Sequence, residues 1–511
     1  MFARTYGSET FGIEGIIIDV EVDVSPGLPH FEVVGLAESS VKEAKGRFRP
    51  AIKNSGFSLQ QEKVTINLAP ADVRKSSPGL DLPMAVGVLA AYGEIPAKKL
   101  QGSLFIAELT LEGELRPVRG VLPMTIAARD MGFERIFVAP VNADEALLVD
   151  GIEVYAPPNL REVADFLTGR KNILPAESHA DEIPPTSAFH EDFADVQGQF
   201  FAKRALEIAA AGGHNVLMVG SPGSGKTMLA RRMPTILPKL SREEALEVTK
   251  IYSIVGKLPK SGGLVDERPF RSPHHDVTMQ AVSGGGTIPR PGEVTLAHNG
   301  VLFLDELPEF NKQTLETLRQ PLEDRVVTVS RVNATVTYPA NIILICAMNP
   351  CPCGYAGDKS GAHRCVCSAD EIKRYTRRIS GPLLDRIDIH INVPRVKYED
   401  LSAKTKAEPS AKIRERVEAA RKIQFRRLKK YDVFCNAQIN RGFLRETCPM
   451  ESAAQELLRQ AFERLYMSGR SHDRVIKVAR TIADLAGEEI ITARHISEAV
   501  GLRADVGLNI E

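Results

Sequence analysis

The sequence has no net charge, no long apolar run and no internal repeat. Lys plus Arg and Asp plus Glu each total 65 of 511 residues, so overall charge does not attract a polyanion, and any nucleic-acid site must come from local clustering. No stretch approaches the roughly 18 uninterrupted apolar residues of a membrane-spanning helix, and the N-terminus lacks the apolar segment of a signal peptide. These absences predict a cytoplasmic protein with no membrane partner.

Cysteine is scarce and unevenly placed. There are seven cysteines in all, an odd number, and Cys351, Cys353, Cys365 and Cys367 are close together. This distribution suits a metal site in a reducing compartment better than a disulfide framework. Two Cys-x-Cys pairs supply four thiolates, enough for a tetrahedral structural Zn²⁺, with His363 as an alternative ligand. Free buried thiols are the alternative to a metal.

The length and the changes in composition predict several domains, because 511 residues exceed what one hydrophobic core usually supports. Residues 1–168 alternate short apolar runs with helix-like segments, which predicts a compact α/β domain. Residues 169–192 are polar and contain prolines, as in an exposed linker. Residues 193–395 predict an α/β core with a parallel sheet, and residues 396–511 predict a helical C-terminal domain.

Individual elements follow from the same periodicities. Strands are expected at 16–24, 64–68, 104–108, 136–139, 215–219, 301–304 and 342–347, and helices at 83–91, 124–131, 199–211, 227–233, 453–467, 474–486 and 492–500. Residues 404–430 carry eleven Lys or Arg against three Glu. This excess is a local basic stretch that could meet phosphates.

A phosphate-binding loop follows the strand expected at 215–219. The pattern Gly-x4-Gly-Lys-Thr lies between a strand and a helix, where backbone N–H groups and the helix N-terminus can surround phosphates. Lys226 is expected to reach the β- and γ-phosphates, and Thr227 to ligate Mg²⁺. The predicted nucleotide-binding residues are Gly220, Ser221, Pro222, Gly223, Ser224, Gly225, Lys226 and Thr227. An ordinary Gly-rich turn is the alternative interpretation.

Two further strands end in polar side chains. Asp305 and Glu306 follow the apolar run 301–304, so both carboxylates are expected at the carboxyl edge of a buried strand. Asp305 is predicted to hold the Mg²⁺ shell with Thr227, and Glu306 to orient and deprotonate the attacking water. Asn349 follows the strand at 342–347 and could contact the γ-phosphate or the water, although an amide before proline is also a common turn residue. Together these residues predict a Mg²⁺-dependent ATPase.

Several longer motifs resemble the AAA+ ATPases, and more narrowly the magnesium-chelatase-like ComM/YifB family of bacterial proteins. They are Arg-Pro-Phe-Arg-Ser-Pro-His-His at 268–275, the glycines at 284–286, Pro-Arg-Pro-Gly-Glu-Val at 289–294, the segment 296–307, Ala-Met-Asn-Pro-Cys-Pro-Cys-Gly at 347–354, and the segment 380–388. The resemblance covers nearly the whole chain. It implies an N-terminal Lon-protease-like domain, an AAA+ P-loop core with inserted hairpins and a helical lid.

The resemblance also assigns roles to two arginines. Arg386 is similar to the finger that enters a neighbouring subunit's site, which implies a homo-oligomeric ring, expected to be a hexamer. A structural ion pair with Asp385 or Asp388 is the alternative. Arg474 resembles the second sensor arginine, with Arg470 close enough to compete for that role. A hairpin expected at 325–338, with a tip at Asn333 and Ala334, would face a central pore, and Arg331 and Arg290 could grip phosphates there.

The N-terminal resemblance to Lon does not carry over its chemistry. Lon-type cleavage needs a serine activated by a lysine. Ser77 could be the nucleophile, but Leu122 stands where the lysine is expected, so no protease activity is predicted unless another lysine such as Lys75 moves in.

Together with the local motifs, the resemblance implies an ATP-hydrolysing ring motor on single-stranded or branched DNA. The resemblance implies a helicase that promotes branch migration of recombination intermediates in natural transformation. The alternative is a magnesium-chelatase-like ATPase that acts as a chaperone on a protein partner, and an ATP-dependent protease is the third hypothesis.

Overall fold

The structure is a computed structural model that describes residues 1–36, 39–60, 62–177, 191–259, 263–286, 289–331, 334–357, 364–396 and 407–503. His363, Asn333 and most of the predicted linker lie outside the described residues. The chain divides into two compact units. Unit 1 comprises Met1–Thr186 with Ala245–Val265, and unit 2 comprises Ser187–Glu244 with Asp266–Glu511. The mixed α/β fold expected from the sequence is confirmed.

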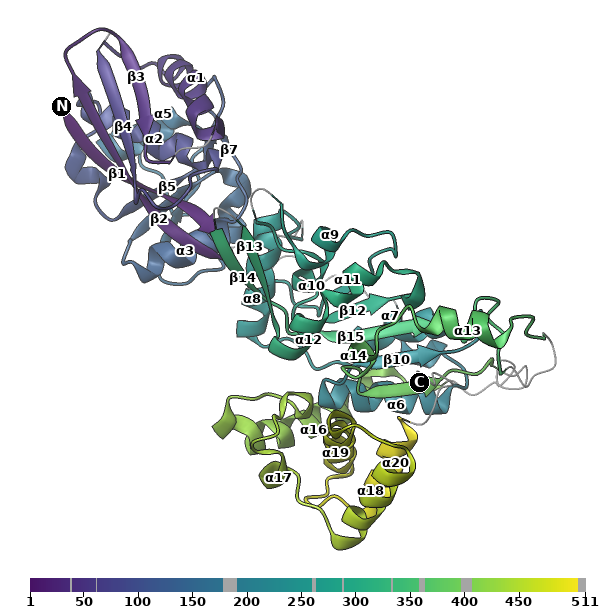
Figure 1. Cartoon of the computed structure of the whole chain (residues 1–511). Helices are drawn as coiled ribbons and strands as arrows, with labels where there is room; N and C mark the ends of the chain where they lie inside the picture. The colour runs from purple at the N-terminus through teal and green to yellow at the C-terminus, as the bar shows by residue number, and fades with distance from the viewer. Residues whose placement is uncertain are drawn as a thin grey trace. The chain divides into compact units, whose positions relative to one another are not determined.

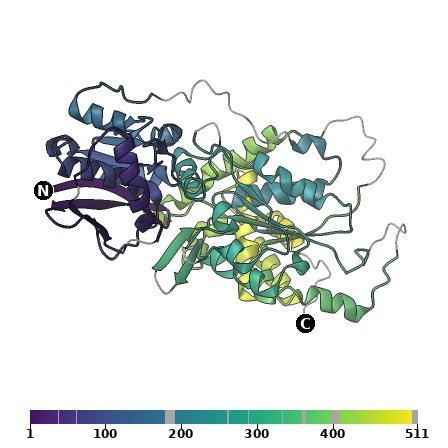
Figure 2. The ribbon, with the colours of Figure 1, turned by 90° about the horizontal axis from the view of Figure 1, so that it is seen from above.

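Unit 1 is built on a four-stranded sheet of order β1-β2-β4-β3. The long strands β1 and β2 pair antiparallel from Phe2 opposite Asp23 to Phe11 opposite Glu14, and run side by side in Figures 1 and 2. In β2, alternate residues Ile18, Val20, Val22 and Val24 are buried, as a strand with one face on a core requires. Helix α2 is buried along its whole length and packs on this sheet.

Unit 1 also contains a smaller parallel sheet. Strands β5, β8 and β9 pair in that order, α3 lies between β5 and β8 in the sequence, and α5 follows β9. The bounds in unit 1 are β1 Phe2–Phe11, β2 Glu14–Ser25, β3 His30–Val34, α1 Ser39–Asn54, β4 Lys63–Ala69, α2 Asp81–Ala91, β5 Ser103–Ile106, β6 Glu108–Leu109, β7 Leu115–Arg116, α3 Val121–Asp130, β8 Arg135–Val138, α4 Ala143–Ala146, β9 Glu153–Tyr155 and α5 Leu160–Thr168.

The chain passes from unit 2 to unit 1 within helix α8 (Arg242–Val255). The helix belongs to unit 2 up to Glu244 and to unit 1 from Ala245 onward. Ser253 donates a hydrogen bond to the buried carboxylate of Glu145, which also accepts from the backbone of Leu122 at 2.8 Å. Burial raises the pKa of Glu145. The sequence pattern did not indicate that a helix inserted after the phosphate-binding loop would pack in the N-terminal unit. The predicted boundaries at residues 168, 192 and 395 stay predictions.

Unit 2 contains a five-stranded parallel sheet of order β11-β12-β15-β10-β16. Its central strands are fully buried, as expected of a parallel sheet covered on both faces. The bounds are α6 Phe200–Gly212, β10 Val216–Val219, α7 Lys226–Ile236, β11 Phe270–Arg271, α9 Met279–Ser283, α10 Glu293–Leu296, β12 Val301–Leu304, α11 Lys312–Glu316, α12 Arg319–Asp324, β15 Ile343–Met348, α13 Ala369–Thr376, α14 Gly381–Leu384 and β16 Ile389–Asn392.

The expected hairpin is present as β13 (Val326–Arg331) and β14 (Ala334–Pro339). Val327, Val329, Val336 and Tyr338 are buried on one face. The opposite face carries hydroxyl side chains, and the Oγ1 atoms of Thr328 and Thr337 lie 3.5 Å apart.

The C-terminal helices pack on the P-loop core within unit 2. They are α16 Ser410–Leu428, α17 Leu444–Thr447, α18 Ser452–Arg464, α19 Gly469–Ala486 and α20 Ala493–Gly501, drawn in green to yellow in Figure 1. Helices α16 and α19 contact α6, and one hydrophobic cluster joins the sheet to these helices. No helix among the described residues has the length and apolarity to cross a membrane.

Candidate nucleotide-binding site

The phosphate-binding loop begins where the buried strand β10 ends and stops at the first residue of α7. Gly220 allows a close approach, because a Cβ there would lie 2.3 Å from the carbonyl oxygen of Val393 and 2.8 Å from Oγ of Ser224. Gly225 has φ +90 and starts the helix from the left-handed region. The loop therefore has the strand–loop–helix context that the sequence predicted.

Lys226 is the first residue of α7, and it is largely buried. Its Nζ donates to the carbonyl oxygens of Gly220 at 2.7 Å and Ser221 at 3.1 Å, and to Oδ1 of Asn349 at 3.3 Å. Desolvation lowers the pKa of Lys226, against the opposing charges of Asp305 and Glu306. The structure thus brings the predicted phosphate-binding lysine and the predicted amide of β15 together.

Thr227 and Asp305, the predicted Mg²⁺ ligands, are hydrogen-bonded. Oγ1 of Thr227 donates to Oδ2 of Asp305 at 2.7 Å, and Oδ1 of Asp305 accepts from the backbone N–H of Glu306 at 3.0 Å. A hydroxyl and a carboxylate are oxygen donors of the kind that Mg²⁺ prefers. Glu306 has φ +52 and its side chain is 57 % exposed. Left-handed backbone at a non-glycine residue costs free energy and is common at functional sites.

These groups line one cavity of about 390 Å³. Its lining comprises residues 222–228, Asp305, Glu306, Met348 and Asn349. A second cavity of about 410 Å³ shares residues 222–225 and Met228 with the first, and is completed by Asp195, Val196, Gln197, Gln199, Leu229, Arg395 and Val396. The two cavities therefore adjoin at the phosphate-binding loop.

Sequence reasoning missed the residues that complete this second cavity, because they follow no motif. Gln199 has φ +53, and its Nε2 donates to the carbonyl oxygens of Ser224 at 3.1 Å and Pro394 at 2.6 Å. It therefore ties the start of α6 to the phosphate-binding loop and to the end of the sheet.

His275 is a second residue to which the sequence assigned no role. Its Nδ1 lies 3.5 Å from Oε2 of Glu306, and its ring meets Phe310 edge-on at 6.4 Å between centroids. It follows β11, the neighbour of β12 in the sheet. The signal was present in the doubled histidine after the Arg-Pro-Phe-Arg segment. The structure adds that this imidazole contacts the predicted catalytic carboxylate.

Arg386 is buried. It does not form the ion pair with Asp385 or Asp388 that was the alternative to a role as an arginine finger. Its guanidinium binds the carboxylate of Glu323, rather than Asp385 or Asp388, and Nη1 donates to the carbonyl oxygen of Pro382 at 2.8 Å. The hydrogen bond from Arg386 lowers the pKa of Glu323, and the charge of the exposed Arg470 acts in the same direction.

Arg474, the predicted sensor arginine, is engaged elsewhere in unit 2. Its guanidinium binds the carboxylate of Asp388, and Nη1 also donates to the carbonyl oxygen of Arg386 at 3.1 Å. Asp388 is buried and accepts from His214 Nδ1 at 3.3 Å. Although desolvation would raise the pKa of Asp388, the charge of Arg474 and the hydrogen bond from His214 hold it well below its usual range. Neither cavity described above is lined by Arg474.

The four clustered cysteines come together, with every Sγ within 4.8 Å of the others. The Sγ atom of Cys351 lies 3.3 Å from that of Cys353 and 3.7 Å from that of Cys365, and Cys353 and Cys365 are 3.6 Å apart. A tetrahedral Zn²⁺ with bonds of about 2.3 Å places its sulfurs about 3.8 Å apart. These separations also exceed the roughly 2.05 Å of a disulfide. The cysteine set therefore fits a structural zinc ion.

The Lon-like residues of unit 1 do not form a serine–lysine pair in the structure. Leu122 is fully buried in an apolar cluster with Ile126 and Val149. Oγ of Ser77 accepts from the backbone N–H of Gly79 at 3.0 Å, and the buried Lys75 donates to the carbonyl oxygen of Pro70. Lys75 is thus bound within its own loop.

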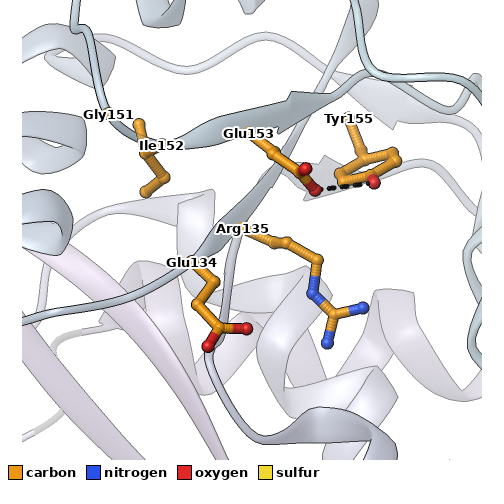
Figure 3. A pocket seen from close by; sticks show the side chains of 6 residues that line it. All are labelled: Glu134, Arg135, Gly151, Ile152, Glu153 and Tyr155. Atoms are coloured by element: carbon orange, nitrogen blue, oxygen red, sulfur yellow. Dashed lines mark hydrogen bonds between the residues drawn. The ribbon is translucent and has the colours of Figure 1, made fainter.

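Unit 1 also has a hollow of about 680 Å³, shown in Figure 3. Arg135 projects into it between Glu134 and Glu153, and Tyr155 donates to Glu153 at 2.9 Å. None of the predicted site residues lines this hollow.

The parallel sheet, the phosphate-binding loop and the carboxylates at the tip of β12 define a P-loop ATPase of the AAA+ type. Comparison with known proteins identifies the family. The description "Magnesium chelatase, subunit ChlI" matches residues 192–401, "Subunit ChlI of Mg-chelatase" matches residues 20–142, and "Magnesium chelatase, subunit ChlI C-terminal" matches residues 407–503.

The chain belongs to the magnesium-chelatase-like ComM/YifB family. It is 43% identical to the competence protein ComM of Haemophilus influenzae over 513 residues, which cover 99% of this chain and 98% of that protein. It is 44% identical to the uncharacterized protein YifB of Escherichia coli over 96% of this chain and 95% of that protein. A partial match, 31% identical over 30% of this chain and 28% of that protein, joins it to Lon protease 2 of Bacillus subtilis. The family carries with it the expectation of ATP and Mg²⁺.

Proposed function

We propose that this chain is an ATP-hydrolysing ring motor on DNA, a helicase that promotes branch migration of recombination intermediates in natural transformation. The observation that carries the proposal is the convergence of Lys226, Thr227, Asp305, Glu306 and Asn349 on one cavity. The likeness to a relative named as a competence protein over nearly the whole chain supports the biological setting.

The residues divide the chemistry of hydrolysis between them. Backbone N–H groups of the loop and Nζ of Lys226 hold the phosphates, so Lys226 would exchange its carbonyl acceptors for phosphate oxygens. Thr227 and Asp305 would hold Mg²⁺, which when bound neutralises charge on the phosphates. Glu306 orients the attacking water and takes its proton, and Asn349 contacts the γ-phosphate or that water.

Arg386 completes the site of a neighbouring subunit in the proposed ring. Its ion pair with Glu323 keeps the guanidinium in place, and Arg470 adds positive charge near the same carboxylate. An anionic γ-phosphoryl group could replace Glu323 as the partner of Arg386, which would stabilise the transition state. Because each site then needs two chains, the active species is a homo-oligomer, expected to be a hexamer.

Mixing two inactive variants tests whether each ATPase site is built from two neighbouring subunits. Lys226→Ala and Arg386→Ala proteins should each be inactive, since one lacks the phosphate-binding lysine and the other the arginine. An equimolar random ring would combine an intact loop with an intact arginine at about a quarter of its sites, so ATPase activity should reappear on mixing. A mixture that stays inactive while its subunits exchange would contradict the shared site.

The proposal that the chain acts on DNA draws on three features: the exposed face of the hairpin, the arginines Arg290 and Arg331, and the basic stretch at 404–430. The exposed face of the hairpin carries Thr328, Ser330, Thr335 and Thr337, and hydroxyls bind phosphate oxygens. Arg290 is exposed, whereas the side chain of Arg331 lies outside the described residues. In the basic stretch, Arg414, Arg416, Arg421 and Arg427 make bonds within the unit, and Lys412, Lys422, Arg426 and Lys429 are exposed. Within residues 407–430 the stretch thus offers fewer cations to DNA than its sequence suggests, and Lys404 and Lys406 lie outside the described residues.

A magnesium-chelatase-like ATPase acting on a protein partner is the second candidate. It is favoured by the three ChlI family descriptions, which together match most of the chain. This candidate predicts an ATPase rate that does not respond to DNA.

For the cysteine cluster we propose a structural Zn²⁺ bound by Cys351, Cys353, Cys365 and Cys367. Although desolvation opposes ionisation, backbone hydrogen bonds lower the pKa of Cys353 to about 6, whereas hydrogen bonds with the neighbouring thiols raise the pKa values of Cys365 and Cys367. A thiolate is the form that binds metal. Metal analysis of the purified protein should find one zinc per chain, and none in a Cys351→Ser, Cys365→Ser protein.

A further inference from the structure

Gly354, directly after the first cysteine pair, packs on the phosphate-binding loop. At Gly354, a Cβ would lie 2.6 Å from Cδ and 2.7 Å from Cγ of Pro222, and 3.9 Å from Cγ of Asn349. Any side chain with a Cβ atom would displace Pro222 at this position. The backbone at Gly354 therefore packs against Pro222 of the phosphate-binding loop.

The next residue, Tyr355, contacts a residue that lines the second cavity. The ring of Tyr355 lies 5.5 Å from the guanidinium carbon of Arg395, a cation–π contact. Arg395 in turn lines the cavity of about 410 Å³ next to the phosphate-binding loop. Two consecutive residues of one turn thus contact the phosphate-binding loop and a residue that lines the adjoining cavity.

The sulfur cluster sets the shape of this turn. Gly354 N–H donates to the carbonyl oxygen of Cys351 at 2.9 Å, and Ala356 N–H donates to Sγ of Cys351 at 3.3 Å. Cys353 precedes Gly354 directly, and its Sγ lies in the same cluster. Because a bound metal ion fixes the positions of all its ligands at once, it would fix the backbone between them.

We propose that metal occupancy of the four-cysteine cluster controls nucleotide affinity, through the contacts of Gly354 with Pro222 and of Tyr355 with Arg395. In this proposal the metal acts by holding the phosphate-binding loop and the second cavity in shape. The inference rests on the proposed zinc site and on the proposed nucleotide site, and adds a coupling between them.

Two glycines of the same turn give a matched pair of variants. Gly354 has φ +86 and Gly357 has φ +73, so alanine strains the backbone at both positions. A Cβ on Gly357 would meet nothing within 4 Å, whereas one on Gly354 would collide with Pro222. The two variants differ in contact with the phosphate-binding loop and share the backbone strain.

The first experiment measures zinc content and the affinity for a fluorescent ADP analogue in the full-length protein. Both variants should retain one zinc per chain. Gly354→Ala should weaken nucleotide binding about tenfold, and Gly357→Ala should change it less than about twofold. Equal nucleotide affinity in the two variants would overturn the proposed coupling.

The second experiment removes and restores the metal in the wild-type protein. Chelation followed by added Zn²⁺ should lower and then recover nucleotide affinity, with circular dichroism confirming that the chain stays folded. Affinity that is unchanged by complete zinc removal would overturn the inference, and so would a protein that binds no zinc. A wild-type protein that binds zinc but no nucleotide would instead contradict the proposed function.

Discussion

Replacement of Arg474 tests whether this arginine senses nucleotide or holds the lid. Its side chain is 20 % exposed and that of Asp388 is 5 % exposed, so the ion pair is largely buried. Removing one partner of a buried pair costs roughly 3–5 kcal/mol, because the other charge stays buried. Asp388 would retain donors from His214 Nδ1 at 3.3 Å and from the backbone N–H of Asn215 at 3.2 Å. We therefore expect Arg474→Ala to lose about 2–3 kcal/mol of unfolding free energy.

The matched control is Arg470→Ala, four residues earlier in the same helix. Arg470 is exposed, and a surface substitution of this kind changes the unfolding free energy by less than about 0.5 kcal/mol. Urea unfolding followed by circular dichroism gives the stabilities, and titration with a fluorescent ADP analogue gives the affinities. If Arg474→Ala were as stable as the control yet bound nucleotide more weakly, Arg474 would be a nucleotide sensor and the structural role would be wrong.

The same ion pair predicts a pH dependence with a definite sign. The folded-state pKa of Asp388 is depressed, so its contribution to stability is present above about pH 4, the pKa of an unfolded aspartate, and declines as the pH falls. The stability difference between wild type and Arg474→Ala should therefore shrink below about pH 4. A difference that grows on acidification would contradict the assignment of the charge to Asp388.

Further predictions concern the site itself. Lys226→Ala should abolish nucleotide binding, since the loop loses its buried cation, as equilibrium dialysis would show. Glu306→Gln should bind ATP and turn it over about 10²–10⁴-fold more slowly, which a single-turnover assay measures. His275→Ala should lower kcat with little change in nucleotide affinity, because His275 contacts the Glu306 carboxylate rather than the loop; an unchanged kcat would remove its positioning role. Arg386→Ala should bind ATP normally and hydrolyse it very slowly, and normal hydrolysis would contradict the shared site.

Much of the geometry of the candidate site was predictable because each of its motifs is local in sequence. The apolar run 301–304 predicted a strand, and the acids directly after it predicted where the carboxylates would lie. The observed strand has the predicted bounds. Likewise Thr227 lies next to Asp305 because a P-loop helix and the neighbouring strand of a parallel sheet meet at one edge. The hairpin at 326–339 followed from alternating β-branched residues.

The rest depended on contacts between distant segments. The pattern around Arg474 looks like a sensor, but only the fold shows that Asp388 is its partner. The partner of Arg386 is Glu323, 63 residues away, where sequence reasoning considered only adjacent acids. Nor could the packing of α8 in unit 1, or of Gly354 on Pro222, be derived from periodicity, because each joins segments with no shared pattern.

The central claim is that the chain is a motor on DNA, and one measurement tests it most directly. ATPase rates are compared without DNA and with single-stranded DNA, duplex DNA and a four-way junction, alongside a gel that follows dissociation of the junction. Glu306→Gln protein is the control. The account predicts stimulation by DNA and ATP-dependent loss of the junction by the wild-type protein alone. A flat rate across every DNA, with the junction intact, would contradict the motor and favour an ATPase that acts on a protein partner.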